Sequence, residues 1–288
     1  MNNALSIMIE KYHPANNQEK ENAIKEIIQE IVLSGLSRGG FFEKAAFYGG
    51  TCLRIFYDLD RFSEDLDFAL LENDTDFSID HYFPFITKEL KSYGLDMDIS
   101  FKEKDKDNEI QTAFIKGNTL FLMMQFFPQD EETKQIVGNQ KIKIKFEIDV
   151  DNPLGGHTET KYRLLPSPYS VKAFDEATLF AGKIHAIICR DYKNRVKGRD
   201  FYDYLFYCAK NTKINLKYLE NKLKITGKLN NDESLSLDSL KALLKDKFEK
   251  VDYISAINDV SNFISNKDAL RLWNKELFIS TLDTLKAE

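Results

Sequence analysis

The sequence predicts an α+β fold in which a mixed sheet flanked by helices is followed by a helical region. Three observations support this class. Residues 42–71 read as strand, helix and strand joined by a Gly-Gly turn. Residues 141–151, KIKIKFEIDVD, alternate polar and apolar side chains, as a strand with one buried face does. From about residue 175 onward, apolar residues recur at helical spacing.

The elements of the first region follow from apolar spacing and from turn residues. A helix over 19–37 has one apolar face and ends at Ser-Arg-Gly-Gly. Gly49-Gly50 makes a tight turn after a strand, and Thr51 opens the next helix. The expected elements are strand 42–48, a helix from 51, strand 66–71, helix 79–93, and strands 97–102, 110–116, 119–126 and 141–151, with a hairpin turn at Lys116-Gly117-Asn118.

A stretch rich in Pro, Gly and Ser, residues 152–170, is the best candidate for a domain boundary. The first domain is therefore expected to span residues 1–165, and the second, helical domain residues 166–288. The apolar periodicity of the second domain predicts helices over residues 175–190, 199–211, 215–224, 234–249, 251–265 and 273–286.

The composition is that of a globular protein, with 43% hydrophobic and 30% charged residues among 288. Apolar runs fall short of the ~20 residues that a membrane helix needs, so no membrane association is expected. The first residues lack the pattern of a secretory signal. The scattered thiols of Cys52, Cys189 and Cys208 suit a reducing compartment. We therefore expect a cytoplasmic protein.

The charge is unevenly distributed. A net charge of −6 disfavours a dedicated duplex-DNA binder. However, residues 190–199 concentrate basic side chains, and a strand nearby begins Lys-Ile-Lys-Ile-Lys. Such a patch suits a locally anionic partner, such as a nucleotide or an RNA end, although a solvated loop is the alternative. The basic residues of the run are Arg190, Lys193, Arg195, Lys197 and Arg199.

Two carboxylates one residue apart, Asp65 and Asp67, interrupt an otherwise apolar strand. Alternate residues of a strand point to the same face, and two close carboxylates repel unless a cation lies between them. A solvated surface is one explanation and a Mg²⁺ site is the other. A third ligand is available on the strand 141–151 as Glu147 or Asp149, and we favour Glu147 because Asp149 lies nearer the loop.

The turn Gly49-Gly50-Thr51 stands between a strand and a helix. Backbone N–H groups at a helix N-terminus bind phosphate, and glycines allow a phosphate to approach. Lys183 is the lone charge within an apolar helix, so it is expected to reach an anion such as a triphosphate.

At this level of detail the chain resembles a known family. The segment YGGTCLRIFYDLDRFSEDLDF and, later, residues 179–207, LFAGKIHAIICRDYKNRVKGRDFYDYLFY, resemble the two signatures of the AbiEii/AbiGii toxin family. These are nucleotidyltransferases of the DNA polymerase β-like superfamily. The signatures occur in the right order, and the resemblance covers roughly residues 40–210.

The resemblance implies a nucleotidyltransferase fold and a role for each motif residue. Asp65 and Asp67 would hold Mg²⁺, with Glu147 as the third carboxylate. Gly49, Gly50 and Thr51 would contact the phosphates of a nucleotide. Lys183 and Asp200 fall on the third and fourth motifs, and both belong to the second predicted domain.

Four more polar residues lie within the signatures. Arg54 is expected to reach the triphosphate, and Arg61 to fix the turn before Asp65. His185 is read as structural or as a contact at the rim of the site. Asp203, three residues after Asp200, is expected to pair with Arg199 or with a neighbouring helix.

The implied function is a Mg²⁺-dependent nucleotidyltransferase that moves a nucleoside monophosphate from an NTP to an RNA acceptor, such as a tRNA 3′ end. It would be the toxin of a toxin–antitoxin or abortive-infection system, opposed by a separately encoded antitoxin. The basic run at 190–199 would contact the RNA or the triphosphate. Two alternatives remain: transfer to a small molecule or protein hydroxyl, and a non-catalytic nucleotide-binding module.

Overall fold

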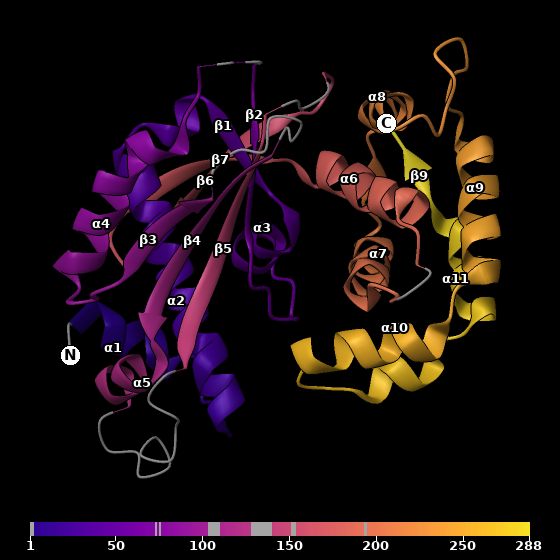
Figure 1. Cartoon of the computed structure of the whole chain (residues 1–288). Coiled ribbons are helices and arrows are strands. Elements are labelled where there is room, and N and C mark those ends of the chain that lie inside the picture. The colour runs from indigo at the N-terminus through magenta and orange to yellow at the C-terminus, as the bar shows by residue number, and fades with distance from the viewer. Residues whose placement is uncertain are drawn as a thin grey trace. The chain divides into compact units, whose positions relative to one another are not determined.

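The computed structural model describes residues 3–72, 74, 76–102, 110–127, 140–150, 154–192 and 195–288 (Figure 1). The chain forms two compact units. The sheet unit comprises Met1–Cys52, Ser63–Asn152 and Thr160–Ala173. The helical unit comprises Leu53–Phe62, Pro153–Glu159 and Phe174–Glu288.

A seven-stranded mixed sheet with the order β3-β4-β5-β2-β1-β7-β6 forms the centre of the sheet unit. β2 pairs antiparallel with β1 and parallel with β5, and β4 pairs antiparallel with both β3 and β5. The pairing of β1 with β7 is parallel. The strands span Ala45–Tyr48 (β1), Leu66–Leu70 (β2), Asp98–Lys102 (β3), Ile110–Asn118 (β4), Lys141–Asp149 (β5), Thr158–Arg163 (β6) and Tyr169–Phe174 (β7).

One face of this sheet is built from aromatic rings. Phe68 on β2 stacks on Phe47 of β1 at 5.0 Å and on Phe146 of β5 at 4.6 Å between ring centroids. All three side chains are buried. Because side chains alternate along a strand, Asp67 and Glu147, each one residue from a buried phenylalanine, point to the opposite face.

The sheet unit also contains the helices α1 (Asn3–Glu10), α2 (Asn17–Arg38), α4 (Phe83–Ser92) and α5 (Thr119–Phe126), with short 3₁₀ helices at Phe41–Glu43 and Ile79–Tyr82. The long helix α2 begins at Asn16, whose side chain accepts a hydrogen bond from the Glu19 backbone N–H. It contacts α4, α5 and β5. α3 (Gly49–Phe56) begins in the sheet unit and ends in the helical unit.

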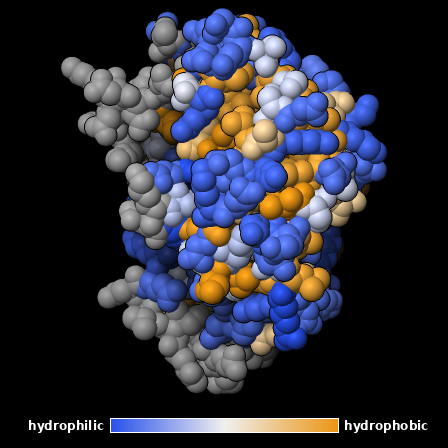
Figure 2. Space-filling model, turned by 90° about the vertical axis from the view of Figure 1, so that its right-hand side faces the viewer, coloured by the Kyte–Doolittle hydropathy of each residue, from blue (hydrophilic) through white to orange (hydrophobic). Residues whose placement is uncertain are grey.

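The helical unit contains α6 (Glu176–Cys189), α7 (Gly198–Lys210), α8 (Leu216–Ile225), α9 (Leu237–Lys250), α10 (Tyr253–Val260) and α11 (Lys275–Thr281). Short 3₁₀ helices cover Ser261–Phe263, Asp268–Leu272 and Leu282–Thr284, and β8 (Lys213–Ile214) pairs with β9 (Lys286–Ala287). Hydrophilic and hydrophobic residues are interspersed on the face shown in Figure 2.

Aromatic side chains fill the core of the helical unit. Tyr204 of α7 packs on Phe248 of α9 with ring centroids 5.2 Å apart, and Phe248 packs on Phe278 of α11 at 5.3 Å. α7 also lies very close to α10, because a Cβ at Gly198 would fall 1.8 Å from the Ala256 carbonyl oxygen. Only glycine permits this approach of two backbones.

The expected α+β class is confirmed: a mixed sheet flanked by helices is followed by a run of helices. All six helices predicted after residue 175 are present, although α10 and α11 continue as 3₁₀ turns. Among the described residues, no helix is both long and apolar enough to cross a membrane.

Three sequence-based expectations were wrong. Residues 119–126 form the helix α5 rather than a strand, and Lys116-Gly117-Asn118 belongs to β4 instead of a hairpin turn. The Asn118 side chain caps α5 by accepting from the Phe121 N–H. The expected strand 42–48 begins only at Ala45, after a 3₁₀ turn. The candidate boundary segment 152–170 includes β6 and the start of β7 among its described residues.

Candidate active site

The Asp67 carboxylate lies directly against the glycine turn that opens α3. Gly49 has φ +80°, and a Cβ built there would fall 2.3 Å from Asp67 Oδ2. The register places Tyr48, the last residue of β1, beside Asp67 on β2. Position 49 therefore requires glycine for two reasons: the positive φ of its backbone and the Asp67 carboxylate that occupies the space of a Cβ.

The parallel pairing of β2 and β5 sets Asp67 beside Glu147, while Asp149 is opposite Ala69. Laterally paired residues share a face of the sheet, so Asp67 and Glu147 project from the same side. Both are half-buried, as is Asp65. The register thus favours Glu147 over Asp149 as a partner of Asp67. Glu147 forms an ion pair with Lys145, whose Nζ lies 2.6 Å from Glu147 Oε1.

Thr51 is fully buried, and its hydroxyl donates a hydrogen bond to the backbone carbonyl of Asp65. The third residue of the glycine turn therefore holds the chain that enters β2. This contact fixes the backbone from which the Asp65 and Asp67 side chains project. The sheet unit in this way joins the turn and the acidic pair into one local arrangement.

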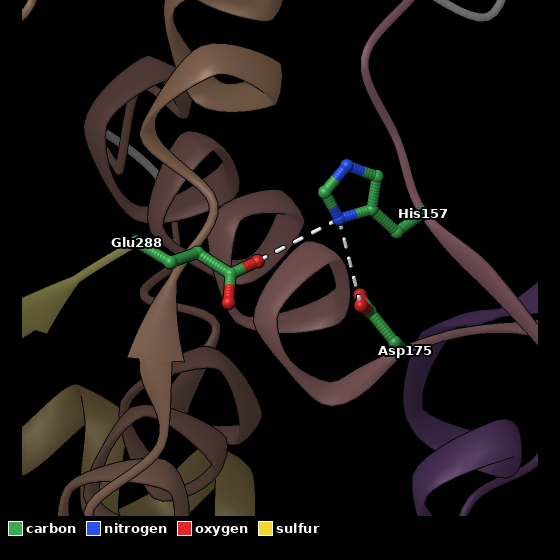
Figure 3. Close-up of side chains that lie close together, drawn as sticks. All are labelled: His157, Asp175 and Glu288. Atoms are coloured by element: carbon green, nitrogen blue, oxygen red, sulfur yellow. Dashed lines mark ion pairs between the residues drawn. The ribbon is translucent and has the colours of Figure 1, made fainter.

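Among the described residues, one group of three side chains of metal-ligating type has its ligand atoms all within 4.8 Å of one another: His157, Asp175 and Glu288 (Figure 3). It belongs to the helical unit. His157 Nδ1 lies 3.8 Å from Asp175 Oδ2 and 3.6 Å from Glu288 Oε1. Sequence reasoning did not single out this cluster, because its residues come from three distant segments. The carboxylates of Asp65, Asp67 and Glu147 are spaced more widely than this.

A buried network of charges surrounds Lys183 in the helical unit. Lys183 Nζ donates to Asp200 Oδ1 at 3.0 Å and lies 2.8 Å from Asp203 Oδ2. Arg61 binds Asp203 with two parallel hydrogen bonds, Nε to Oδ1 at 2.6 Å and Nη2 to Oδ2 at 2.7 Å. Arg190 pairs with the other oxygen of Asp200. Three cations and two carboxylates therefore alternate through the network.

The network keeps its members charged. Burial alone would lower the pKa of Lys183, but Asp203 and Asp200 outweigh burial and raise this pKa above its ordinary value. Burial alone would raise the pKa of Asp203, yet Arg61 and Lys183 hold it below its ordinary value. Arg61 and Asp203 are almost inaccessible, with side-chain exposures of 2% and 0%, whereas Lys183 retains 15%. Lys183 is therefore a persistent cation that solvent still reaches.

Comparison with known proteins identifies the family. The chain matches the family described as "Nucleotidyl transferase AbiEii toxin, Type IV TA system" over residues 31–274. This match covers most of the 288 residues. The chain belongs to the AbiEii family of nucleotidyl transferase toxins.

Solved structures and curated proteins complete the comparison. The crystal structure of JHP933 from Helicobacter pylori is 18% identical, covering 90% of this chain and 87% of that one, with a TM-score of 0.45. A second protein from H. pylori, described as a candidate nucleotidyltransferase, is 17% identical, covering 88% of each chain with a TM-score of 0.45. No curated protein matches.

Membership in the AbiEii family makes this chain a transferase-family toxin of a type IV toxin–antitoxin system, which has a separate antitoxin. The predicted site residues divide between the two units. Asp65, Asp67 and Glu147 belong to the sheet unit, and Lys183 and Asp200 to the helical unit. The catalytic and binding roles of these residues stay predictions.

The basic run at 190–199 is largely engaged in contacts inside the helical unit of this AbiEii chain. Arg190 pairs with Asp200, and Arg195 donates from Nε to Asp259 Oδ1 at 2.6 Å. The guanidinium of Arg199 lies 4.2 Å from the Phe263 ring centroid. Lys197 is crowded by Arg195 and Arg199, and burial is the largest cause of its lowered pKa. Lys193 lies outside the described residues.

Two further residues of the family signature have structural contacts. Arg54 Nη1 donates to the Leu59 carbonyl at 2.9 Å, which braces the turn after α3. His185 Nε2 lies 3.1 Å from Thr226 Oγ1. Burial, together with Lys222 and Arg190, lowers the pKa of His185 to about 4, so its imidazole is neutral near pH 7.

Sequence reasoning missed how Arg61 and Asp203 meet. Asp203 pairs with Arg61 and Lys183, whereas Arg199 stacks on Phe263. Arg61 also donates to the Phe62 carbonyl at 2.9 Å, which agrees with the expectation that it fixes this turn. The i, i+3 spacing of Asp200 and Asp203 indicated a shared helix face, but no pattern in the sequence linked that face to Arg61.

Proposed function

We propose that this AbiEii chain is a Mg²⁺-dependent nucleotidyltransferase that transfers a nucleoside monophosphate from an NTP to a hydroxyl of RNA, such as a tRNA 3′ end. The observation that carries the proposal is the corner in the sheet unit. There the Asp67 carboxylate packs against Gly49 at the start of α3 and is the register partner of Glu147.

The donor set of this corner fits magnesium. Asp65, Asp67 and Glu147 offer hard carboxylate oxygens, which Mg²⁺ prefers, and their partial exposure leaves room for water and phosphate oxygens. When bound by these residues, Mg²⁺ would neutralise charge on the phosphates of the NTP. Glycine at positions 49 and 50 removes the side chains that would exclude a phosphate from the start of α3.

The chain's own residues then have defined tasks. The acceptor hydroxyl attacks the α-phosphorus in line, the new P–O bond forms, and the bond to the bridging oxygen of pyrophosphate breaks. Glu147 accepts the proton of the attacking hydroxyl. Lys183, held cationic by Asp200 and Asp203, compensates the negative charge of the leaving pyrophosphate.

The test is to incubate the purified protein with total RNA and each α-labelled NTP in turn, with and without Mg²⁺. The proposal expects labelled RNA, tRNA above all, only in the presence of Mg²⁺. Asp67→Asn should abolish labelling. Labelled protein or small molecules with unlabelled RNA would replace the RNA acceptor by another hydroxyl. NTP binding that persists in Asp65→Ala and Asp67→Ala, without any transfer, would indicate a non-catalytic binding module.

A further inference from the structure

A pocket of about 310 Å³ opens beside Asp65 in the sheet unit. Three lysines of one strand, Lys141, Lys143 and Lys145 of β5, line one part of it. Lys25 of α2 lines another part, and there it pairs with two neighbouring acids, Glu21 at 3.2 Å and Glu64 at 3.3 Å. The pocket therefore joins a predicted metal ligand to a row of ammonium groups.

The lysines form a straight row. They occupy alternate positions of β5, so all three project from one face, about 6.6 Å apart along the strand. The same alternation continues to Glu147, the register partner of Asp67. Lys145, nearest the acids, is already paired with Glu147. The row thus leads from the start of β5 towards the carboxylates.

The outer two lysines carry charge that nearby acids do not neutralise. Lys141 and Lys143 are exposed, and among the described residues neither has a carboxylate within ion-pair distance. Lys143 Nζ lies 3.8 Å from the Phe114 ring centroid, and Lys116, its register partner on β4, lies 5.5 Å from the same ring. The aromatic ring holds the two ammonium groups close to the surface of the sheet.

We propose that Lys116, Lys141 and Lys143 bind successive backbone phosphates of a single-stranded RNA acceptor and guide its terminal hydroxyl towards Asp65. The inference rests on the proposed function, because it assigns a path to the acceptor of that reaction. Lys141 and Lys143, evenly spaced on β5, with Lys116 beside Lys143 on β4, suit the repeating charge of a nucleic-acid backbone. It carries no base-reading group, so the binding is independent of sequence along this part of the path.

The row also differs from the basic run at 190–199. In that run, Arg190 is paired with Asp200 and Arg195 with Asp259, and the guanidinium of Arg199 stacks on the Phe263 ring. Lys141 and Lys143, in contrast, are held only by an aromatic ring or by solvent within the described chain. The strand therefore offers the better phosphate contacts.

The test is a pair of charge-reversal variants in the full-length protein. Lys141→Glu with Lys143→Glu alters the row, and Lys88→Glu with Lys91→Glu makes the same change of charge on the exposed side of α4, outside the pocket. Binding of a fluorescein-labelled single-stranded RNA is measured by anisotropy over a range of salt, in EDTA and without NTP. Circular dichroism and thermal unfolding confirm that both variants fold.

The row variant should bind RNA at least about tenfold more weakly than wild type. The slope of a plot of log Kd against log salt concentration should fall by about 1.4, which is ~0.7 for each of the two lost phosphate contacts. The α4 variant should stay within about twofold of wild type. The KM for NTP should be unchanged in both variants. A raised KM for NTP with unaltered RNA affinity would assign the lysines to the nucleotide and overturn the inference.

Failure of the inference is distinguishable from failure of the proposed function. If wild type labels and binds RNA while the row variant behaves like the α4 variant, the acceptor path is wrong and the reaction stands. If wild type neither binds nor labels RNA, the RNA acceptor itself is wrong, and this inference falls with it.

Discussion

Replacing Asp203 by alanine should strongly destabilise the helical unit. The side chain is fully buried and makes two hydrogen bonds to Arg61 and one ion pair to Lys183. Its loss leaves the guanidinium of Arg61, 2% exposed, with one remaining hydrogen bond within the described part of the chain, to the Phe62 carbonyl. Removing one partner of a buried ion pair typically costs about 3–5 kcal/mol, so we expect a loss within this range.

Urea unfolding followed by tryptophan fluorescence measures this loss in the right unit. The chain has one tryptophan, Trp273, which is buried in the helical unit against Phe278 at 5.4 Å. Its emission therefore reports the unfolding of this unit separately from that of the sheet unit, which avoids treating a two-unit chain as one transition. The change should appear as a lower midpoint with a similar slope.

Two controls separate the buried pair from general effects of a lost carboxylate. Asp246→Ala removes an exposed partner of Lys250 on α9 and should change stability far less. Arg61→Met combined with Asp203→Leu removes both charges of the buried pair and should recover much of the lost stability. A loss for Asp203→Ala below about 1 kcal/mol would refute the reasoning, because it would show that Arg61 finds water or another anion.

Three more predictions follow from particular contacts. Gly49→Ala should lower transferase activity by at least about 100-fold, because a Cβ would displace the Asp67 carboxylate. Gly182→Ala is the control and should keep activity, because a Cβ at position 182 would meet no described atom outside its own helix backbone within 4 Å. Equal losses of activity in the two variants would contradict this prediction. Gly198→Ala should force α7 away from α10 and so lower the free energy of unfolding of the helical unit by about 1–3 kcal/mol. Urea unfolding followed by Trp273 fluorescence measures this loss, and an unchanged midpoint would refute the close packing. The fold lowers the pKa of His185 from 6.5 to about 4, so on acidification the unfolded chain binds the proton first. The free energy of unfolding should therefore fall by up to about 3 kcal/mol between about pH 6.5 and pH 4. His185→Gln should remove this pH dependence, and an unaltered pH dependence would assign it to other groups.

Local patterns predicted most of the fold. The helix over 19–37, the strand from Leu66 and the alternation of 141–151 all occur close to the expected bounds. The exception at 119–126 has a physical reason: TLFLMMQF is almost wholly apolar, and a short apolar run has no period that separates a strand from a buried helix. The asparagine at 118, which caps α5, was the available signal, and it was read as a turn residue.

The candidate boundary segment before residue 170 contains strands that the sequence analysis did not predict. Proline, glycine and serine marked the segment as a candidate boundary. The sequence YSVKAF nevertheless alternates and forms β7, the parallel neighbour of β1. Its alternating burial could have been recognised from the sequence. The pairing of Arg61 with Asp203 could not, because 142 positions separate them and only the tertiary fold brings them together.

The candidate site was predictable where chemistry is encoded by neighbours in sequence, and less so where it depends on register. The spacing of Asp65 and Asp67 indicated a shared face, but the choice between Glu147 and Asp149 needed the pairing of β2 with β5, which sets Glu147 beside Asp67. The requirement for glycine at position 49 likewise came from the Asp67 carboxylate that occupies the space of a Cβ.

The charge network around Lys183 separates a structural task from a chemical one. Arg61 and Asp203, nearly inaccessible, form a neutral bidentate pair that solvent and substrate do not reach. Lys183 contacts both Asp203 and Asp200, and Arg190 pairs with Asp200. The three cations of the network therefore exceed its two carboxylates by one positive charge. The excess lies on the members that retain exposure, 15% for Lys183 and 48% for Arg190. The interior pair therefore supports the helix packing, and the outer group keeps a partly exposed cation, which the proposed function assigns to the leaving pyrophosphate. On that proposal, substitutions at Arg61 should lower stability before they alter phosphate chemistry.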